Sequence, residues 1–427
     1  MSYRAEFAFT DLDFCERSTR YKPGGLCPVR LGEILGEPPR YRIIAKLGYG
    51  GYSTVWLARD MVARYACRCI KNVTLKIIEA ADTLESRESE ILRRLQSPSS
   101  VASTDQPLVL QIYDAFKLHS ANGAHQVLVT ETVILLQCLQ LPYSRTSGRD
   151  LVRQAIEAVA FIHDRGVAHG GRFPLYAHIY APSLDLHPRN LGVAVPDLDT
   201  FSDVDIWHHC GQPEIIPLIA YDPARDLASF PPYLSMAIDL GPVLREAPGF
   251  SERRPRVRVI DLGNAYVPAE SPSPRCYTRL EYTAPEVLFP SVAHNNRDSH
   301  WDCRADIWAL ACTIHQLMSG NPFCSRLGGG VRILRETAAL CGGAPKEWQE
   351  YFASRPGAPL VVDYSIEIAD NKWKEREESF RAQGEEDAAG LVKLLRRMLV
   401  IDPTRRPSAS ELLQDSYFAP EENLPRT

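Results

Sequence analysis

The sequence of 427 residues contains no long hydrophobic run. A membrane-spanning helix needs about 18 consecutive apolar residues, and no uncharged apolar stretch of that length occurs. The first residues, MSYRAEFAFTDLDF, also lack the basic segment followed by an apolar segment that marks a secretion signal. We therefore expect a protein without membrane association that stays inside the cell, in the cytoplasm or the nucleus.

An excess of one charge and paired cysteines are absent as well. The chain has 48 Lys and Arg against 53 Asp and Glu, and a net charge of −5 argues against direct nucleic-acid binding. The eleven cysteines are scattered, and neither Cys67/Cys69 nor Cys303/Cys312 has the spacing of a metal site. We expect reduced thiols, many of them buried. With 45% hydrophobic and 24% charged residues and no internal repeat, the chain has the composition of a soluble globular protein.

The first third of the chain is rich in strand patterns. Residues 1–40 are rich in Arg, Pro and Gly and predict an irregular leader. The segments 41–47 and 53–58 alternate and flank glycines, which predicts a hairpin. Residues 82–95 have helical spacing, with Leu84, Ile91, Leu92 and Leu95 on one side, and 126–131 predicts another strand.

The remainder favours helices. A helix is expected from near Asp150, a wholly buried one over 306–318, and a last one after the capping box Ser408-Ala-Ser-Glu411. Residues 195–256 are rich in Pro and Asp and predict a long connection that is functional or disordered. Strands followed by helices predict an α+β fold with two lobes. The small β-rich lobe with one main helix spans 41–133, the larger helical lobe 134–420, and a tail 421–427.

A glycine-rich turn joins the two strands of the predicted hairpin. The segment Gly48-Tyr-Gly-Gly-Tyr-Ser-Thr-Val55 would let backbone amides approach phosphate groups without interference from Cβ atoms. The candidate nucleotide-binding residues here are Gly48, Gly50, Gly51, Ser53 and Val55. An ordinary flexible hairpin is the alternative, since Gly-x-Gly alone is a weak signal and Ser53 replaces a third glycine.

A lysine on the next strand should bind the phosphates, and two candidates exist. Lys76 has apolar residues on both sides, as a buried strand requires, whereas Lys71 lies nearer the expected distance from the glycines. We prefer Lys76, which makes residues 66–72 an insertion in the preceding turn. Glu88 is the candidate ion-pair partner of this lysine, and Glu90, which faces another side of the helix, is expected in solvent. Either lysine could instead be a solvated charge at a strand end.

Two acidic motifs complete the set. Asp185-Leu-His-Pro-Arg-Asn190 places a carboxylate five residues before a carboxamide, and Asp261-Leu-Gly263 follows an apolar run. Asp185 would accept or orient the proton of a substrate hydroxyl, and Asn190 and Asp261 would hold Mg²⁺ beside ATP. Either motif alone could be a turn. Their order, followed by Ala284-Pro-Glu286, makes a chance occurrence improbable.

The chain resembles the SR-protein kinase (SRPK) family, particularly its divergent fungal-type members. Leu47-Gly-Tyr-Gly-Gly-Tyr-Ser-Thr-Val-Trp-Leu-Ala58, the leader segment Tyr21–Glu33, Asp261-Leu-Gly-Asn-Ala265 and Thr278-Arg279 are similar to motifs of that family, over about residues 20–420. The segment 195–256 falls where the family has a spacer between its lobes. The resemblance implies a bilobal protein kinase fold, ATP and Mg²⁺ as cofactors, and transfer of phosphate to Ser or Thr of arginine–serine-rich splicing factors. We expect a monomer.

The resemblance also implies roles for residues outside the acidic motifs. Thr130 would be the gatekeeper, and Glu131-Thr-Val133 the hinge that binds adenine. Glu286 would pair with Arg406, and Asp306 would be a buried acid that braces the catalytic loop. The alternative for Glu286 and Arg406 is a pair of surface charges, which would contribute little.

The chain departs from the family around Asp185. The fourteen residues 171–184 separate His169-Gly170 from Asp185, where the family motif is continuous. The insertion loops out and leaves both ends in register, or it damages the site, or it is a gene-model error. His187 stands where Ser/Thr kinases commonly have a lysine on the γ-phosphate, and a neutral imidazole would stabilise the developing charge less well. Gly170 stands where many regulated kinases have an arginine that binds an activation-loop phosphate, so we expect activity that needs no activation-loop phosphorylation.

Two rival functions remain. Small-molecule phosphotransferases share the Asp185–Asn190 pattern but lack the glycine loop and the Ala-Pro-Glu motif. The more serious rival is a pseudokinase that acts as a binding scaffold. The acidic tracts Glu375–Glu378 and Glu385–Asp387 could attract an arginine-rich protein substrate, although such charge runs are usually solvated faces.

Overall fold

The computed structural model describes most of the chain. The described ranges are 7–8, 15–62, 71–84, 86–97, 107–136, 148–170, 186–222, 224, 226–246, 256–271, 280–295, 301–325, 329–354 and 364–419. The chain forms two compact units: Met1–Ile134 with Val193–Arg254, and Leu135–Gly192 with Pro255–Thr427. Within the described ranges, no helix combines the length and the apolar composition that crossing a membrane requires.

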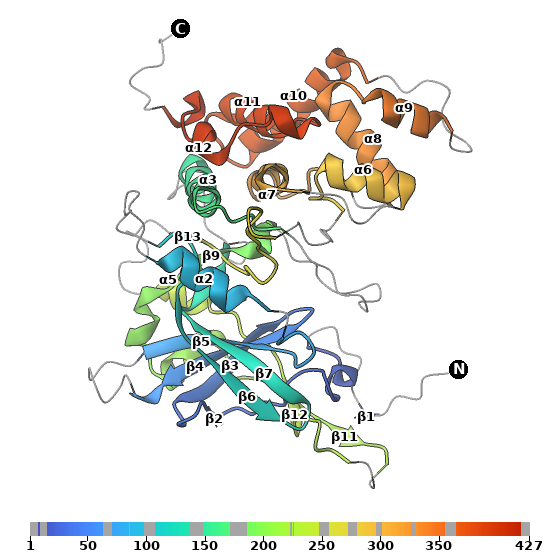
Figure 1. Ribbon diagram of the computed structural model, residues 1–427. Helices are drawn as coiled ribbons and strands as arrows, with labels where there is room; N and C mark the ends of the chain where they lie inside the picture. Colours follow the sequence, from blue (N-terminus) through green and yellow to red (C-terminus); the bar gives the residue numbers. More distant parts are fainter. Residues whose placement is uncertain are drawn as a thin grey trace. The chain divides into compact units, whose positions relative to one another are not determined.

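The first unit is built on a six-stranded antiparallel sheet (Figure 1). Its strands, in the order β2-β3-β4-β5-β7-β6, are β2 (Ile34–Leu35), β3 (Tyr41–Tyr49), β4 (Ser53–Asp60), β5 (Lys71–Ile78), β7 (Gly123–Thr130) and β6 (Ile112–Ser120). Apolar side chains of β3, β4, β5 and β7 form one buried core, including Ile43, Trp56 and Leu75. The predicted hairpin and the strand near 126–131 are confirmed.

The helix of this unit starts later than the sequence predicted. Helix α2 covers Glu88–Gln96, and Leu84, expected on its buried face, is 89% exposed. The preceding segment is held as a turn instead: the Thr83 hydroxyl donates to the Glu79 carbonyl and accepts from the Gln126 amide. The prediction for residues 66–72 is also corrected at its end, because β5 already begins at Lys71.

The described part of the leader is packed into the core rather than irregular. Tyr21, Leu26 and Cys27 are at most 3% exposed, and a short 3-10 turn, η1, covers Ser18–Arg20. The Nζ of Lys46 on β3 forms a fully buried ion pair with Glu16, which also accepts from the Tyr21 hydroxyl at 2.5 Å. The composition of the leader, rich in Arg, Pro and Gly, did not predict this packing, because the residues that the leader contacts lie on a later strand.

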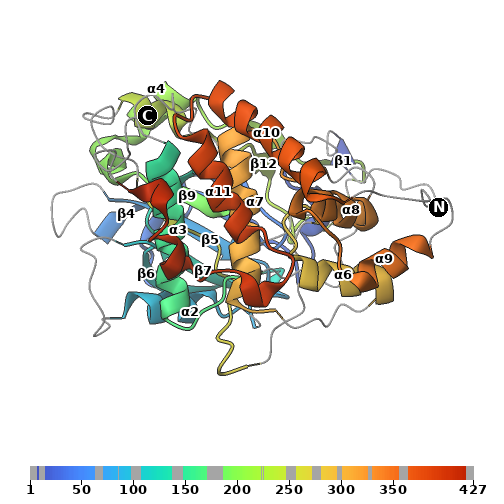
Figure 2. The same cartoon turned by 90° about the horizontal axis from the view of Figure 1, so that it is seen from above.

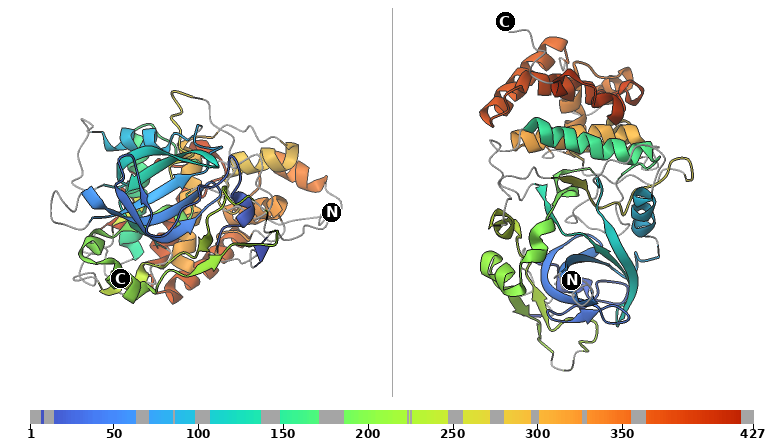
Figure 3. Two further views of the ribbon diagram at one scale, coloured as in Figure 1. Left: turned by 90° about the horizontal axis from the view of Figure 1, so that it is seen from below. Right: turned by 90° about the vertical axis from the view of Figure 1, so that its left-hand side faces the viewer.

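Residues 193–254 group with the sheet although the sequence order placed them within the larger lobe. They form η4 (Pro196–Thr200), α4 (Asp203–Cys210), β10 (Ile215–Pro217), β11 (Ile219–Ala220), β12 (Tyr233–Ser235) and α5 (Gly241–Glu246). β10 pairs with β12, and β11 with β1 (Phe7–Ala8). Both views in Figure 3 show the green start of this segment beside the blue strands.

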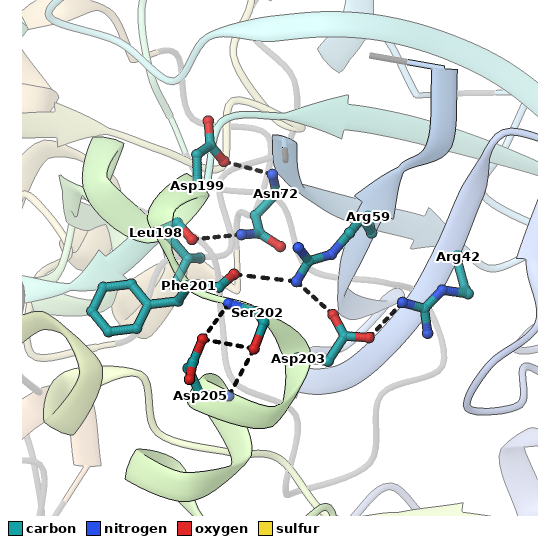
Figure 4. Close-up of polar contacts among 9 residues, drawn as sticks. All are labelled: Arg42, Arg59, Asn72, Leu198, Asp199, Phe201, Ser202, Asp203 and Asp205. Carbon is teal, nitrogen blue, oxygen red and sulfur yellow. Dashed lines mark hydrogen bonds and ion pairs between the residues drawn. The ribbon is translucent and has the colours of Figure 1, made fainter. Parts of the chain in front are cut away.

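Polar contacts join this segment to β3, β4 and β5 (Figure 4). Asp203 lies between two arginines of the sheet, and its carboxylate pairs with both Arg42 and Arg59. The side-chain amide of Asn72 donates to the Leu198 carbonyl at 2.6 Å, and its backbone N–H donates to Asp199 at 2.6 Å. Arg59 is 3% exposed, so its charge depends on this carboxylate.

The second unit is mainly helical. Its helices are α3 (Gly148–Asp164), α6 (Pro285–His294), α7 (Cys303–Ser319), α8 (Gly329–Cys341), α9 (Lys346–Ala353), α10 (Ile366–Ala382), α11 (Ala388–Met398) and α12 (Ala409–Leu412), with 3-10 turns η3 (Pro188–Asn190), η5 (Pro403–Arg405) and η6 (Ser416–Phe418). The short strand β13 (Val257–Val259) belongs to this unit, whereas β8 (Val133–Leu135) and β9 (Leu191–Ala194) each cross a boundary between the units in sequence.

The long helix α7 is the centre of this unit. Helices α3 and α11 pack against it, as Figure 2 shows. Its residues Ala305–His315 are all buried, as predicted, whereas Gln316 and Leu317, which lie in the segment predicted to be wholly buried, are partly exposed. The helix predicted from near Asp150 is α3, and the capping box of Ser408 and Glu411 is complete in both directions at α12.

Asp203 should stabilise the first unit. We expect Asp203→Asn to lower the free energy of unfolding by about 2 kcal/mol, because the buried Arg59 charge loses its counter-ion while the pair is partly open to solvent. Urea unfolding and hydrogen exchange of the α4 amides would measure the loss. The matched control is Glu214→Gln, an exposed acid of the same segment. Equal unfolding midpoints for the two variants would contradict this role.

Candidate active site

The glycine turn between β3 and β4 has glycines that the fold itself does not require. Neither Gly48 nor Gly50 has a positive φ. A Cβ on Gly48 would meet nothing within 4 Å, and one on Gly50 would come only within 4.0 Å of the Ser53 hydroxyl. The Gly50 N–H donates to the Ser53 carbonyl at 2.9 Å and closes the turn. The bare backbone therefore leaves open space for a close-fitting ligand such as a phosphate chain.

The structure brings Lys76 and Glu88 together. The Lys76 Nζ lies 2.7 Å from the Glu88 carboxylate, whose side chain is 2% exposed while that of Lys76 is 20% exposed. Lys71 points elsewhere, with its Nζ 3.7 Å from the centroid of the Tyr113 ring. Glu90 is exposed and pairs with Arg87, as its helix position predicted. Of the two lysines, only Lys76 is held by a buried carboxylate.

The segment after β7 is rigidly held. Thr130, the last residue of β7, is 2% exposed. Glu131 and Gln111 exchange two bonds: the Glu131 N–H donates to the Gln111 carbonyl, and the Gln111 N–H to the Glu131 carboxylate, both at 2.9 Å. The Thr132 hydroxyl accepts from that of Thr74 at 3.2 Å, and Val133 begins β8. Such a segment could present its backbone to a base without moving.

In the second unit, two candidate metal ligands have neighbouring backbones. The Ile260 N–H donates to the Asn190 carbonyl at 2.9 Å, which places Asn190 beside the residue that precedes Asp261. Asp261 has φ of 60°, a conformation costly for a residue other than glycine and often found at functional sites. Carboxylate and amide oxygens suit Mg²⁺, with phosphate oxygens completing its shell. Asp185 lies outside the described residues.

A buried carboxylate braces the segment before the insertion. Asp306 of α7 accepts from the backbone N–H groups of His169 at 2.7 Å and Gly170 at 3.1 Å. His163, which the sequence reasoning missed, lies with its Nε2 3.0 Å from the same carboxylate. Burial alone would lower the pKa of His163, but its hydrogen bonds to Asp306 and Cys303 and their negative charge together raise it to about 10.

Glu286 and Arg406 are a structural pair rather than surface charges. The guanidinium of Arg406 makes two bonds to the Glu286 carboxylate, at 2.7 and 2.6 Å, and its side chain is fully buried. It also donates to the carbonyls of Val400 at 2.7 Å and Arg304 at 2.9 Å. This bidentate pairing fixes the start of α6 to the residue that follows η5. Thr278 and Arg279 lie outside the described residues.

The structure shows the surroundings of Gly170 and His187, the two residues that depart from the family pattern. Gly170 has φ of 61°, and a Cβ there would lie 1.7 Å from the Trp301 ring, so an arginine does not fit. His187 is 3% exposed, and its Nδ1 accepts from the Arg189 N–H at 3.0 Å. This bond caps η3 and leaves that ring nitrogen unprotonated.

Comparisons with known proteins agree with this geometry. Residues 250–418 match the protein kinase domain model. The chain is 26% identical over 428 residues to the serine/threonine-protein kinase SRPK of Physarum polycephalum, covering 95% of this chain and 91% of that one. It is 23% identical to a serine/threonine protein kinase of Aspergillus fumigatus, covering 94% and 90%. Protein kinase dsk1 of Schizosaccharomyces pombe is 24% identical, covering 72% and 65%.

Residues 250–418 therefore belong to a protein kinase domain, and nearly the whole chain is similar to serine/threonine kinases, one of them named SRPK. A protein kinase uses ATP, typically with a divalent metal ion. In this kinase the domain model covers Asp261, Glu286, Asp306 and Arg406, and the longer matches to the Physarum and Aspergillus proteins also span most of the first unit. The candidate residues thus divide between the units: the glycine turn, Lys76 and Glu88 in the first, and Asn190 and Asp261 in the second.

The raised pKa of His163 predicts a pH dependence of the stability of the kinase. Between about pH 6.5, the unfolded pKa, and pH 10, the folded protein holds a proton that the unfolded chain has lost. The free energy of unfolding should therefore fall as the pH rises through this window. Urea unfolding at pH 7 and 9.5 should show a smaller fall for His163→Gln. The control is His294→Gln, an exposed histidine of the same unit. Equal pH slopes for all three proteins would rule out this account.

Proposed function

We propose that this chain transfers the γ-phosphate of Mg-ATP to serine or threonine of protein substrates inside the cell. The observation that carries the proposal is the ion pair of Lys76 with the buried Glu88 carboxylate at 2.7 Å. A lysine held in this way can bind the α- and β-phosphates of ATP in a fixed position. Since phosphoryl transfer depends mainly on positioning and charge stabilisation, this pair supports a working nucleotide site rather than a remnant.

The other residues have complementary roles in this proposal. The amides of the Gly48–Ser53 turn bind phosphate oxygens, Val55 covers the adenine, and the Thr130–Val133 segment binds its polar edge. Asn190 and Asp261 hold Mg²⁺, which neutralises the charge that develops on the phosphates. Asp185 orients the hydroxyl of the substrate and takes its proton.

The alternative is a pseudokinase impaired by residues 171–184. The flanks of this insertion favour an active enzyme. Gly170 is bound by Asp306, and the carbonyl of Leu186 accepts from the Thr313 hydroxyl. Asp306 and Thr313 lie two turns apart on one face of α7, so the same helix holds both ends of the insertion. We infer that α7 keeps both flanks of the insertion in place.

Two variants test the nucleotide site. Lys76→Met should reduce phosphate transfer by about 10²-fold or more, because one charged contact to the phosphates is lost, and should lower the melting temperature, because the buried Glu88 carboxylate loses this counter-ion. Gly50→Ala should keep the melting temperature, since its Cβ meets open space, and should raise the KM for ATP. Transfer from radiolabelled ATP and thermal melting measure these effects. Unchanged transfer in both variants would contradict the proposed site.

A deletion variant tests whether the insertion impairs phosphate transfer. The full chain and a variant lacking residues 171–184 should show transfer rates of the same order, and phosphatase treatment should not abolish them. If the deletion variant alone transfers phosphate, the insertion is damaging. Nucleotide-dependent thermal stabilisation without transfer in either form would favour the pseudokinase.

Arginine–serine-rich proteins are the substrates we propose. The relatives support this through their SRPK names, and Glu375 and Glu378 are exposed on α10. In the second acidic tract Glu386 alone is exposed: Glu385 is 7% exposed and accepts from the Tyr417 hydroxyl, and Asp387 is partly buried and caps α11. The substrate argument therefore depends on α10 and not on both acidic tracts.

A peptide screen tests this substrate class. We expect an Arg-Ser repeat peptide to be phosphorylated at least tenfold better than a peptide with acidic residues around its serine. Glu375→Gln with Glu378→Gln should raise the KM for the repeat peptide severalfold at low salt, because an attraction between opposite charges is removed. The matched control is Glu350→Gln on α9, which is also exposed. Equal use of both peptides would contradict the assignment.

A further inference from the structure

An arginine of the leader is bound to the back of the glycine turn. The Arg20 guanidinium donates from Nη1 to the Gly50 carbonyl at 2.6 Å and from Nη2 to the Gly51 carbonyl at 2.8 Å. Its Nη2 also lies 2.9 Å from the carboxylate of Glu79, which directly follows β5. One side chain therefore joins three segments: the leader, the glycine turn and the end of the strand that carries Lys76.

These bonds decide which way the amides of the turn point. A trans peptide is planar, and its N–H points opposite to its C=O. With the carbonyls of Gly50 and Gly51 turned toward Arg20, the N–H groups of Gly51 and Tyr52 must point away from it. A donor bound to a carbonyl also polarises the peptide and strengthens its N–H as a donor to an anion.

The leader has the support to hold Arg20 in place. The amides of Ala80 and Ala81 donate to the carbonyls of Gly25 and Gly24 at 3.1 and 2.8 Å. The Arg20 carbonyl accepts from the Leu26 N–H at 3.0 Å, and a Cβ on Gly25 would lie 2.0 Å from that carbonyl oxygen. The close turn around Arg20 thus requires a residue without a side chain at position 25.

We propose that Arg20 is a positioning residue that orders the glycine turn for the phosphates of ATP. This inference rests on the proposed function of that turn as the phosphate-binding loop. A glycine-rich turn has many conformations to lose on binding, and a turn already held by Arg20 loses fewer. Because Glu79 neutralises its charge, Arg20 acts by orienting the peptides rather than by attracting phosphate from a distance.

The proposal predicts an effect that depends on the phosphates. Arg20→Ala should weaken ATP binding about tenfold, the equivalent of one charge-assisted hydrogen bond, and leave adenosine binding unchanged. The ATP affinity of Arg20→Lys should lie between those of Arg20→Ala and the unaltered chain, since an ammonium group cannot reach both carbonyls as the forked guanidinium does. Calorimetric titration of the full chain with ATP and with adenosine measures both affinities. The KM for ATP should rise while kcat and the KM for the peptide stay within about twofold.

Arg30→Ala, which removes an exposed arginine of the same leader, is the matched control and should bind ATP as the unaltered chain does. ATP affinity within twofold of normal in Arg20→Ala would overturn the proposal, and so would an equal loss of ATP and adenosine binding, which indicates general misfolding. If the unaltered chain binds adenosine but gains nothing from the phosphates, the proposed phosphate-binding role of the turn fails, and this inference fails with it.

Discussion

The buried charge of Lys46 is the constraint on which the first unit depends. An ammonium without a counter-ion in a protein core costs several kcal/mol, and the Lys46 side chain has no exposed surface. Burial lowers its pKa, and the attraction of Glu16 opposes that shift. Trp56, whose ring centroid is 5.2 Å from Nζ, gives further compensation. The sheet can bury this lysine only when the leader is docked and brings Glu16.

The backbone of Lys46 also binds the segment formed by residues 193–254. The Ile238 N–H donates to the Lys46 carbonyl at 2.8 Å, so leader, β3 and the 193–254 segment meet at one position. At the other side of the sheet, the Arg59 charge needs Asp203 for the same reason. The leader and the 193–254 segment each provide a carboxylate to a basic residue of the sheet. The geometry of the glycine turn between β3 and β4 therefore depends on residues far from it in sequence.

The sequence predicted the elements that depend on residues close to one another in the chain. The β3–β4 hairpin, α3, α7 and the α12 capping box follow from periodicity and caps, and apolar flanks were enough to favour Lys76 over Lys71. The sequence did not predict the packing of the leader or the start of α2 at Glu88. Those features depend on partners at a distance, such as Glu16 with Lys46 and Thr83 with Gln126. His163 and Arg20 were missed for the same reason, since neither belongs to a motif and only their contacts give them meaning.

In the second unit, the residues on either side of the insertion are both bound to α7. Without residues 171–184 a single residue would separate Gly170 from Leu186, whereas fifteen do so in this chain; at about 0.6 kcal/mol for each doubling of a loop, the added length costs on the order of 2 kcal/mol in closure entropy. Against this stand the Asp306 bonds to two backbone amides at one end and the Thr313 bond at the other; a bond to a charged group contributes about 1.5–3 kcal/mol. The anchors on α7 outweigh the entropy of the longer loop, so the position of Asn190 is set by the helix and not by the length of the chain before it.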